Sequence, residues 1–120
     1  MEIKKRFVDD IPILELTGRF VLGADAPRRP LRALVAELAM DGRVNVLLDV
    51  ARLTDIDAHG LGELAWSSSA LRRAGGRLAL IGPRGWVRRL ISLTRLDTAI
   101  TVYDSEAEAT ARALETVCLG

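Results

Sequence analysis

The stretch of the chain most typical of a buried strand is residues 44–50, which read Val-Asn-Val-Leu-Leu-Asp-Val. Only Asn45 and Asp49 interrupt this apolar run. A strand that is covered on both faces, as in the middle of a parallel sheet, has a near-continuous apolar sequence of this kind. We therefore expect residues 44–50 to form a central strand that contains Val46 and Leu48 or their neighbours.

Strand-like and helix-like patterns alternate on both sides of this run. Strands are predicted at residues 3–8, 11–22, 44–50, 77–81 and 100–103. Helices are predicted around residues 31–38, 61–71 and 87–94, and Ser105 with Glu108 forms a capping box that opens a fourth helix. The order ββαβαβαβα predicts a single α/β domain over residues 1–120. Its sheet should be mixed but mainly parallel, and backed by about four helices.

The composition excludes several classes of function. A net charge of +1 and only five aromatic residues (two Trp, one Tyr and two Phe) give no case for nucleic-acid binding. The only cysteine, Cys118, cannot form an internal disulfide, which fits the reducing cytoplasm. No apolar run approaches the roughly 20 residues of a membrane span. We expect a cytoplasmic protein without direct membrane insertion.

The junction between the central strand and the second helix, residues 53–62, carries the most information about function. Asp57 is placed to cap the helix, because its carboxylate can accept backbone N–H groups two or three residues further on. A helix start that faces solvent also favours anions, so a phosphate added there would have a large local effect. His59, the only histidine, is expected to be an exposed polar residue at this helix start.

The second predicted helix should turn one face toward the sheet. On a helical wheel, that inner face consists of Leu61, Leu64, Ala65, Ser68 and Leu71. His59, Gly62, Glu63 and Trp66 should then point largely away from the core. Trp66 is either an anchor for a partner protein or a residue that packs on a neighbouring helix or loop, and the sequence leaves both open.

Four parts of the chain, taken in one register, resemble STAS domains of the anti-sigma factor antagonist family. They are residues 44–50, the turn Asp57…Gly60-Leu61-Gly62, residues 75–83, and a tail with Leu90, Leu96-Asp97, Ile100, Tyr103-Asp104-Ser105 and Glu108-Ala109. The resemblance implies a STAS-like fold and a protein–protein interaction module in bacterial partner-switching signalling, which regulates transcription. The implied partner is an anti-sigma factor that is also a serine kinase, or a larger STAS signalling assembly.

The serine that this family uses as a switch is missing here. In the family, the turn commonly reads Asp-Ser-Ser-Gly-Leu-Gly, and a serine in it is phosphorylated by the kinase. Ala58 and His59 stand at the two serine positions, so they form a degenerate phosphosite. Residues 18–21, Gly-Arg-Phe-Val, also replace a segment that is often acidic in the family. We expect a chain that is held in one state or serves as a scaffold.

The resemblance also implies where the partner binds, namely at the exposed start of the second helix and its flanking loops. The predicted partner-binding residues are Asp57, Ala58, His59, Gly60, Gly62, Glu63 and Trp66. A homodimer is left open.

Two other functions fit parts of the sequence. Residues 64–96 contain seven arginines and no acidic residue. Such a block could face the ATPase of a phospholipid-transporting ABC system, to which small STAS subunits also attach. A receiver-like phosphoacceptor domain has a similar length, but here Asp9 and Asp10 precede a strand and no lysine follows Lys5.

Catalysis is not expected from this sequence. It contains no nucleophile–base pair and no phosphate-binding glycine loop that we can identify. Asp49, Asp55 and Asp57 are better explained by strand ends and caps than by a magnesium site, because no further ligands accompany them. We therefore predict no enzyme activity, no cofactor and no metal.

Overall fold

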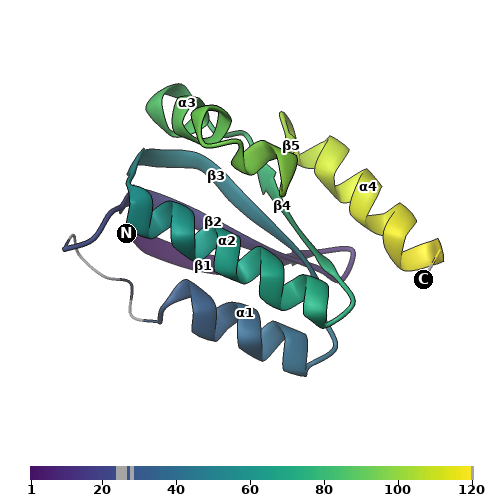
Figure 1. The fold of residues 1–120 in the computed structure, drawn as a ribbon. Helices are drawn as coiled ribbons and strands as arrows, with labels where there is room; N and C mark the ends of the chain where they lie inside the picture. The colour runs from purple at the N-terminus through teal and green to yellow at the C-terminus, as the bar shows by residue number, and fades with distance from the viewer. Residues whose placement is uncertain (24–26, 28, 120) are drawn as a thin grey trace.

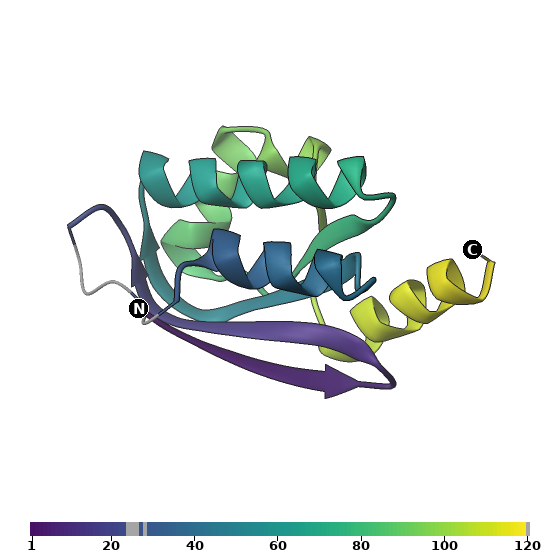
Figure 2. The same ribbon diagram turned by 90° about the horizontal axis from the view of Figure 1, so that it is seen from below.

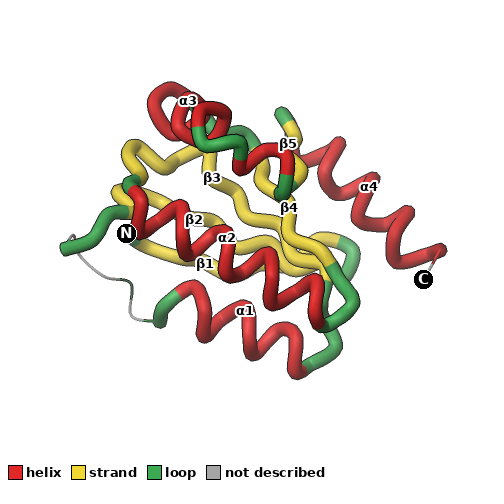
Figure 3. Tube along the Cα trace, viewed as in Figure 1, coloured by secondary structure: helices red, strands yellow, loops and turns green. Residues whose placement is uncertain are grey.

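A five-stranded sheet organises the protein, as the computed structural model shows for residues 1–23, 27 and 29–119 (Figure 1). Its strands are β1 (Glu2–Val8), β2 (Ile11–Phe20), β3 (Asn45–Ile56), β4 (Arg77–Ile81) and β5 (Thr101–Tyr103). They lie side by side in the order β1-β2-β3-β4-β5, and Figure 3 shows them in yellow. The β1–β2 pair is antiparallel, whereas the other three pairs are parallel. The predicted mixed, mainly parallel sheet is confirmed.

Four α-helices cover the two faces of this sheet unequally. They are α1 (Leu31–Met40), α2 (Ala58–Arg73), α3 (Gly85–Leu93) and α4 (Glu106–Leu119), and a short 3₁₀ helix, η1 (Leu96–Thr98), follows α3. Apolar residues of α1, α2 and α3 join one core cluster with the sheet, whereas Ala109 of α4 belongs to a second, smaller cluster. Figure 2 shows the same arrangement, with α4 apart from the other helices. The side chains of residues 116–119, Cys118 among them, lie outside the described part of the chain.

The central strand is buried on both sides, as its sequence predicts. Val46, Leu48 and Val50 of β3 pack into the larger cluster, and Leu47 between them packs into the smaller one. Leu47 pairs with Ile13 of β2 and with Ala79 of β4, so β3 has a neighbour on each edge. The alternation of β3 between two apolar layers therefore accounts for its unbroken apolar run.

The strand ends differ from the prediction. β3 continues to Ile56 instead of ending near Val50, because its second half stays paired with the end of β2. That pairing runs from Thr17↔Arg52 to Phe20↔Ile56, with one register shift just before it and one within it, between Gly18 and Arg19. β2 ends at Phe20, two residues earlier than expected. As a result, both strands end close to the start of α2.

The prediction of which residues form the inner face of α2 is partly wrong. Ala65 is exposed, and Ser67 is buried in its place. The buried residues of the helix are Gly60, Leu64, Ser67, Ser68 and Leu71. Three of these five side chains are very small, which lets α2 pack closely on the sheet but gives a weak hydrophobic pattern in the sequence.

Replacing Ser67 by alanine should stabilise the fold. The Ser67 hydroxyl is fully buried and has no hydrogen-bond partner among the described residues. Removing an unpaired buried hydroxyl and raising helix propensity should increase the free energy of unfolding by about 1 kcal/mol. Urea denaturation measures this change, with Ser69→Ala on the exposed side as the control for propensity alone. A loss of stability in Ser67→Ala would mean that the hydroxyl has a partner after all.

Candidate functional site

Asp57 joins the start of α2 to the segment that follows β2. Its Oδ1 accepts the Gly60 N–H at an N···O distance of 3.0 Å, as predicted for a helix cap, and its Oδ2 accepts the Leu22 N–H at 2.9 Å. The Gly60 and Leu22 N–H groups hold the pKa of this carboxyl below its usual value. These two hydrogen bonds therefore stabilise the fold fully above the pKa of an unfolded aspartate. Their contribution is lost as the pH falls through the lower pKa of Asp57 in the folded protein.

Gly60 is buried and has a structural role, contrary to the prediction that it lies on the partner-binding surface. A Cβ atom at this position would lie 2.3 Å from the Phe20 carbonyl oxygen and 2.7 Å from Cγ1 of Ile56. Only glycine fits such a close approach between the first turn of α2 and the ends of two strands. Gly60 thus fixes the position of the helix start without being exposed itself.

Ala58, His59 and Gly62 are exposed, as predicted. The His59 ring lies edge-on to Phe20, with 6.4 Å between ring centroids and an interplanar angle of 89°. A Cβ atom at Gly62 would have no neighbour within 4 Å. No contact within the described chain explains a glycine there, although glycine in a helix costs about 1 kcal/mol relative to alanine. A bare backbone on an exposed helix face permits the close approach of another molecule.

Leu22 belongs to the same surface, and sequence reasoning missed it. Its side chain is 74% exposed, and its backbone is bound to Asp57 at the start of α2. The sequence places Leu22 at the end of a predicted strand, where an apolar residue looks like ordinary core. Only the early end of β2 reveals it as an exposed apolar side chain beside the α2 start.

Glu63 and Trp66 turn toward α1 instead of pointing freely away from the core. Arg32 of α1 places its Nε 2.9 Å from both carboxylate oxygens of Glu63, and its guanidinium carbon lies 4.7 Å from the centroid of the Trp66 ring. The Glu63 side chain is only 14% exposed, because the ion pair with Arg32 covers it on the α1 side. Trp66 packs against a neighbouring helix through Arg32 and still keeps part of its surface accessible. No sequence pattern indicated that Arg32 would be part of this site.

Together these contacts build one surface along the first half of α2. Leu22, Ala58, His59 and Gly62 form its exposed part, and the Arg32–Glu63–Trp66 cluster borders it on the α1 side. We call this the α2 surface. Its chemistry suits binding, because it offers aromatic, apolar and bare-backbone contacts on a rigid, capped helix start.

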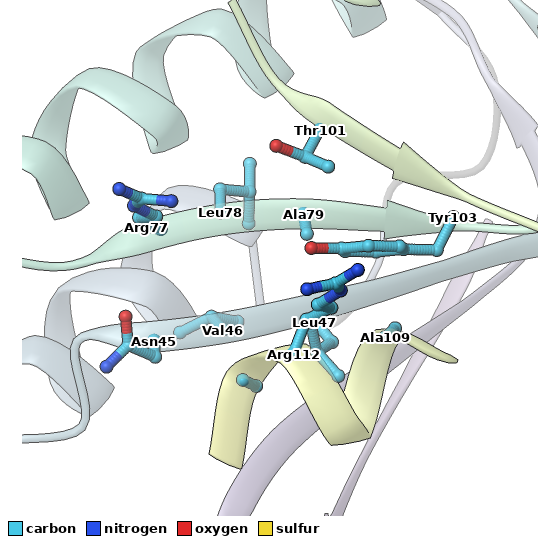
Figure 4. A pocket seen from close by; sticks show the side chains of 11 residues that line it. Asn45, Val46, Leu47, Arg77, Leu78, Ala79, Thr101, Tyr103, Ala109 and Arg112 are labelled. Carbon is cyan, nitrogen blue, oxygen red and sulfur yellow. The ribbon is translucent and has the colours of Figure 1, made fainter. Parts of the chain in front are cut away.

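A hollow lies between β3, β4, β5 and α4, on the face of the sheet that α4 covers (Figure 4). Figure 4 shows the Arg112 guanidinium beside the ring of Tyr103, with Arg77 and Asn45 at the opposite end. The residues that line the hollow include no acidic, histidine or cysteine side chain that could act as a base or nucleophile. The hollow is separate from the α2 surface, because the two share no residue.

Two further observations on the described residues concern membrane-spanning helices and metal-binding groups. No helix between Glu2 and Leu119 is both long and apolar enough to cross a membrane, the undescribed positions aside. Within the same described part of the chain, no group of three or more His, Cys, Asp or Glu side chains is arranged to hold a metal ion.

Solved structures of other proteins share this fold. The crystal structure of a Thermotoga maritima protein with the provisional name of an anti-sigma factor antagonist superposes with a TM-score of 0.78 at 23% identity, over 92% of this chain and 93% of that one. The anti-sigma factor antagonist SpoIIAA in its unphosphorylated form gives a TM-score of 0.69 at 17% identity, over 94% and 97% of the two chains. At these identities the likeness concerns the fold.

Sequence comparison agrees with the fold. A curated Thermotoga maritima protein, also provisionally named an anti-sigma factor antagonist, is 32% identical over 73 residues. The match spans 61% of this chain and 65% of that protein, slightly less than two thirds of its length. Residues 2–109 match the STAS domain family. Because this match covers the whole sheet and the whole α2 surface, the chain belongs to the STAS domain family.

Proposed function

We propose that this protein is a non-enzymatic, anti-sigma factor antagonist-like module that binds an anti-sigma factor kinase, or a STAS signalling assembly, through the α2 surface. The observation that carries the proposal is the start of α2, which is capped by Asp57, fixed by the close approach at Gly60, and exposed at Ala58, His59 and Gly62. The names of its relatives support the same function. Such a module acts in the cytoplasm, where sigma factors and their regulators meet.

In this proposal, the chain lacks the phosphorylation switch but retains the α2 surface that binds the partner. Ala58 has no oxygen to accept a phosphoryl group, and the His59 imidazole is not a substrate for serine phosphorylation chemistry. Both side chains are nevertheless exposed at a helix start, where a phosphate would add charge and bulk to a contact. The chain therefore acts as a constitutive binder or as a scaffold.

Trp66→Ala tests the proposed surface. We expect it to weaken binding to an anti-sigma factor kinase of the same organism by about 1–3 kcal/mol, the range for an aromatic interface anchor. Isothermal titration calorimetry measures the affinity. Thermal melts provide the control, because loss of the Arg32–Trp66 contact should change the melting temperature only slightly.

Unchanged affinity in Trp66→Ala would show that Trp66 is not part of the interface. A large fall in melting temperature would instead assign Trp66 to the packing between α1 and α2. A kinase that binds neither the wild type nor Trp66→Ala would contradict the choice of partner.

The alternative function, a STAS subunit of a phospholipid-transporting ABC system, has less support. It relies on the arginine block alone, whereas the relatives compared above carry the name of anti-sigma factor antagonists. Binding to a transporter ATPase, with no affinity for an anti-sigma factor, would favour it.

A further inference from the structure

The exposed side of α3 is the most unusual surface outside the α2 surface. Trp86 and Leu93 are 53% and 65% exposed, although both are large apolar residues. Val87 and Ile91 on the other side of the helix are buried against the sheet. Residues 86, 89 and 93 are three and four positions apart, so the two exposed apolar side chains and Arg89 lie along one stripe. This stripe has no partner within the described chain.

Positive charge surrounds the stripe and is not neutralised. Arg84 and Arg89 are exposed and form no ion pair with any described residue, whereas Arg88 pairs with Asp104 at 3.0 Å. The first turn of α3 contains no acidic residue, and no side chain caps it. The partial positive charge of the helix start therefore adds to that of the arginines.

We propose that the α3 surface, defined as Arg84, Trp86, Arg89 and Leu93, binds an acidic segment of another protein. In the complex, carboxylates of the segment contact the arginines and the uncapped start of α3, and an apolar side chain covers Trp86 and Leu93. Charge complementarity selects the acidic partner. Tryptophan and arginine side by side are the residue types that dominate protein–protein contacts.

A protein segment fits this surface better than a membrane does. Helices that lie on bilayers gain their affinity from a long apolar face, whereas α3 has nine residues and only two large exposed apolar side chains. The two apolar side chains, Trp86 and Leu93, with arginines beside them, match the size of a short peptide contact.

This second surface is spatially separate from the first. Figure 1 shows α1 and α3 on opposite sides of α2, so a partner on the side of the α2 surface that borders α1 leaves α3 accessible. The inference goes beyond the proposed function. The chain has one surface for a signalling partner and another for an acidic segment, and it can hold both at once.

NMR titration of the full 120-residue chain tests the proposal. The probe is a synthetic 12-residue amphipathic peptide of glutamate and leucine, and its matched counterpart has lysine at every glutamate position. We expect the Glu/Leu peptide to shift backbone amide signals of residues 84–95, with an affinity that falls as NaCl is raised. The Lys/Leu peptide should cause no such shifts.

Two variants locate the binding site. Trp86→Ala and Arg89→Glu should each weaken binding of the Glu/Leu peptide at least fivefold. Arg73→Glu, an identical charge reversal at an exposed position of α2, is the control and should leave the affinity within twofold of the wild type.

Three results would overturn the proposal. The first is equal binding of the two peptides, or peptide shifts that Arg89→Glu does not reduce. The second is binding to phosphatidylglycerol vesicles that needs Trp86 and Arg89 while the Glu/Leu peptide does not bind, which would assign the surface to a membrane. The third is concentration-dependent self-association that Arg89→Glu abolishes without any peptide binding, which would make it an interface between two copies of this chain.

Discussion

Gly60→Ala should destabilise the fold strongly, although alanine is the better helix former. The added Cβ would lie 2.3 Å from a carbonyl oxygen of the backbone and 2.7 Å from a buried isoleucine carbon, and neither atom belongs to a flexible side-chain end. Either α2 or the end of β2 must move. We expect the free energy of unfolding to fall by about 3 kcal/mol and the melting temperature by about 10 °C.

Gly62→Ala is the matched control for this prediction. It makes the same substitution two residues later in the same helix, where the new Cβ meets nothing within 4 Å. Here alanine should raise stability by up to about 1 kcal/mol through helix propensity. Urea denaturation of both variants would reveal opposite signs. Equal effects in the two variants would show that α2 does not approach β2 as closely as the structure indicates.

His59→Glu should have the largest effect on partner binding. It places a negative charge at the exposed start of α2, where the family carries its phosphoserine. A carboxylate in the first turn of a helix is favourable for the fold, so the melting temperature should stay constant or rise. Partner affinity should nevertheless fall about 100-fold, which corresponds to about 2.7 kcal/mol, because the charge must be desolvated in the contact. Calorimetric titration with the anti-sigma factor kinase gives this value.

Ala107→Glu controls for the added charge. It introduces the same carboxylate at the second residue of α4, an exposed helix position that is not part of the α2 surface. Its partner affinity should stay close to that of the wild type. If both variants weaken binding equally, the effect is general electrostatic repulsion, and the start of α2 has no special role.

The sheet could be predicted well because its signal is local and strong. An unbroken apolar run such as residues 44–50 has few alternatives to a buried strand, and the glycines and turns around it mark the neighbouring elements. The far end of β3 was missed because Arg52 and Asp55 look like loop residues. They are held in the strand by pairing with β2, which is distant in the sequence.

The α2 surface was predicted only in part, because some of its features depend on residues close in the sequence and others on tertiary contacts. The Asp57 cap depends on residues three positions apart, so the sequence reveals it. The buried side of α2 rests on small residues such as Ser67, whose burial has no hydrophobic signature. Arg32 and Leu22 reach the surface only through tertiary contacts, to Glu63 and to Asp57 respectively. No pattern within one segment could have indicated them.

We propose that the α2 surface binds an anti-sigma factor kinase without being switched off by it. The most direct measurement mixes the two proteins with and without Mg-ATP, follows the complex by size-exclusion chromatography, and analyses the peptide with residues 57–62 by mass spectrometry. We predict that the complex persists with ATP and that this peptide carries no phosphate. His59→Ser, which restores a hydroxyl, should acquire phosphate and release the kinase. Phosphate on residues 57–62 of the wild-type chain, with ATP-dependent loss of the complex, would show that the kinase does switch this chain off.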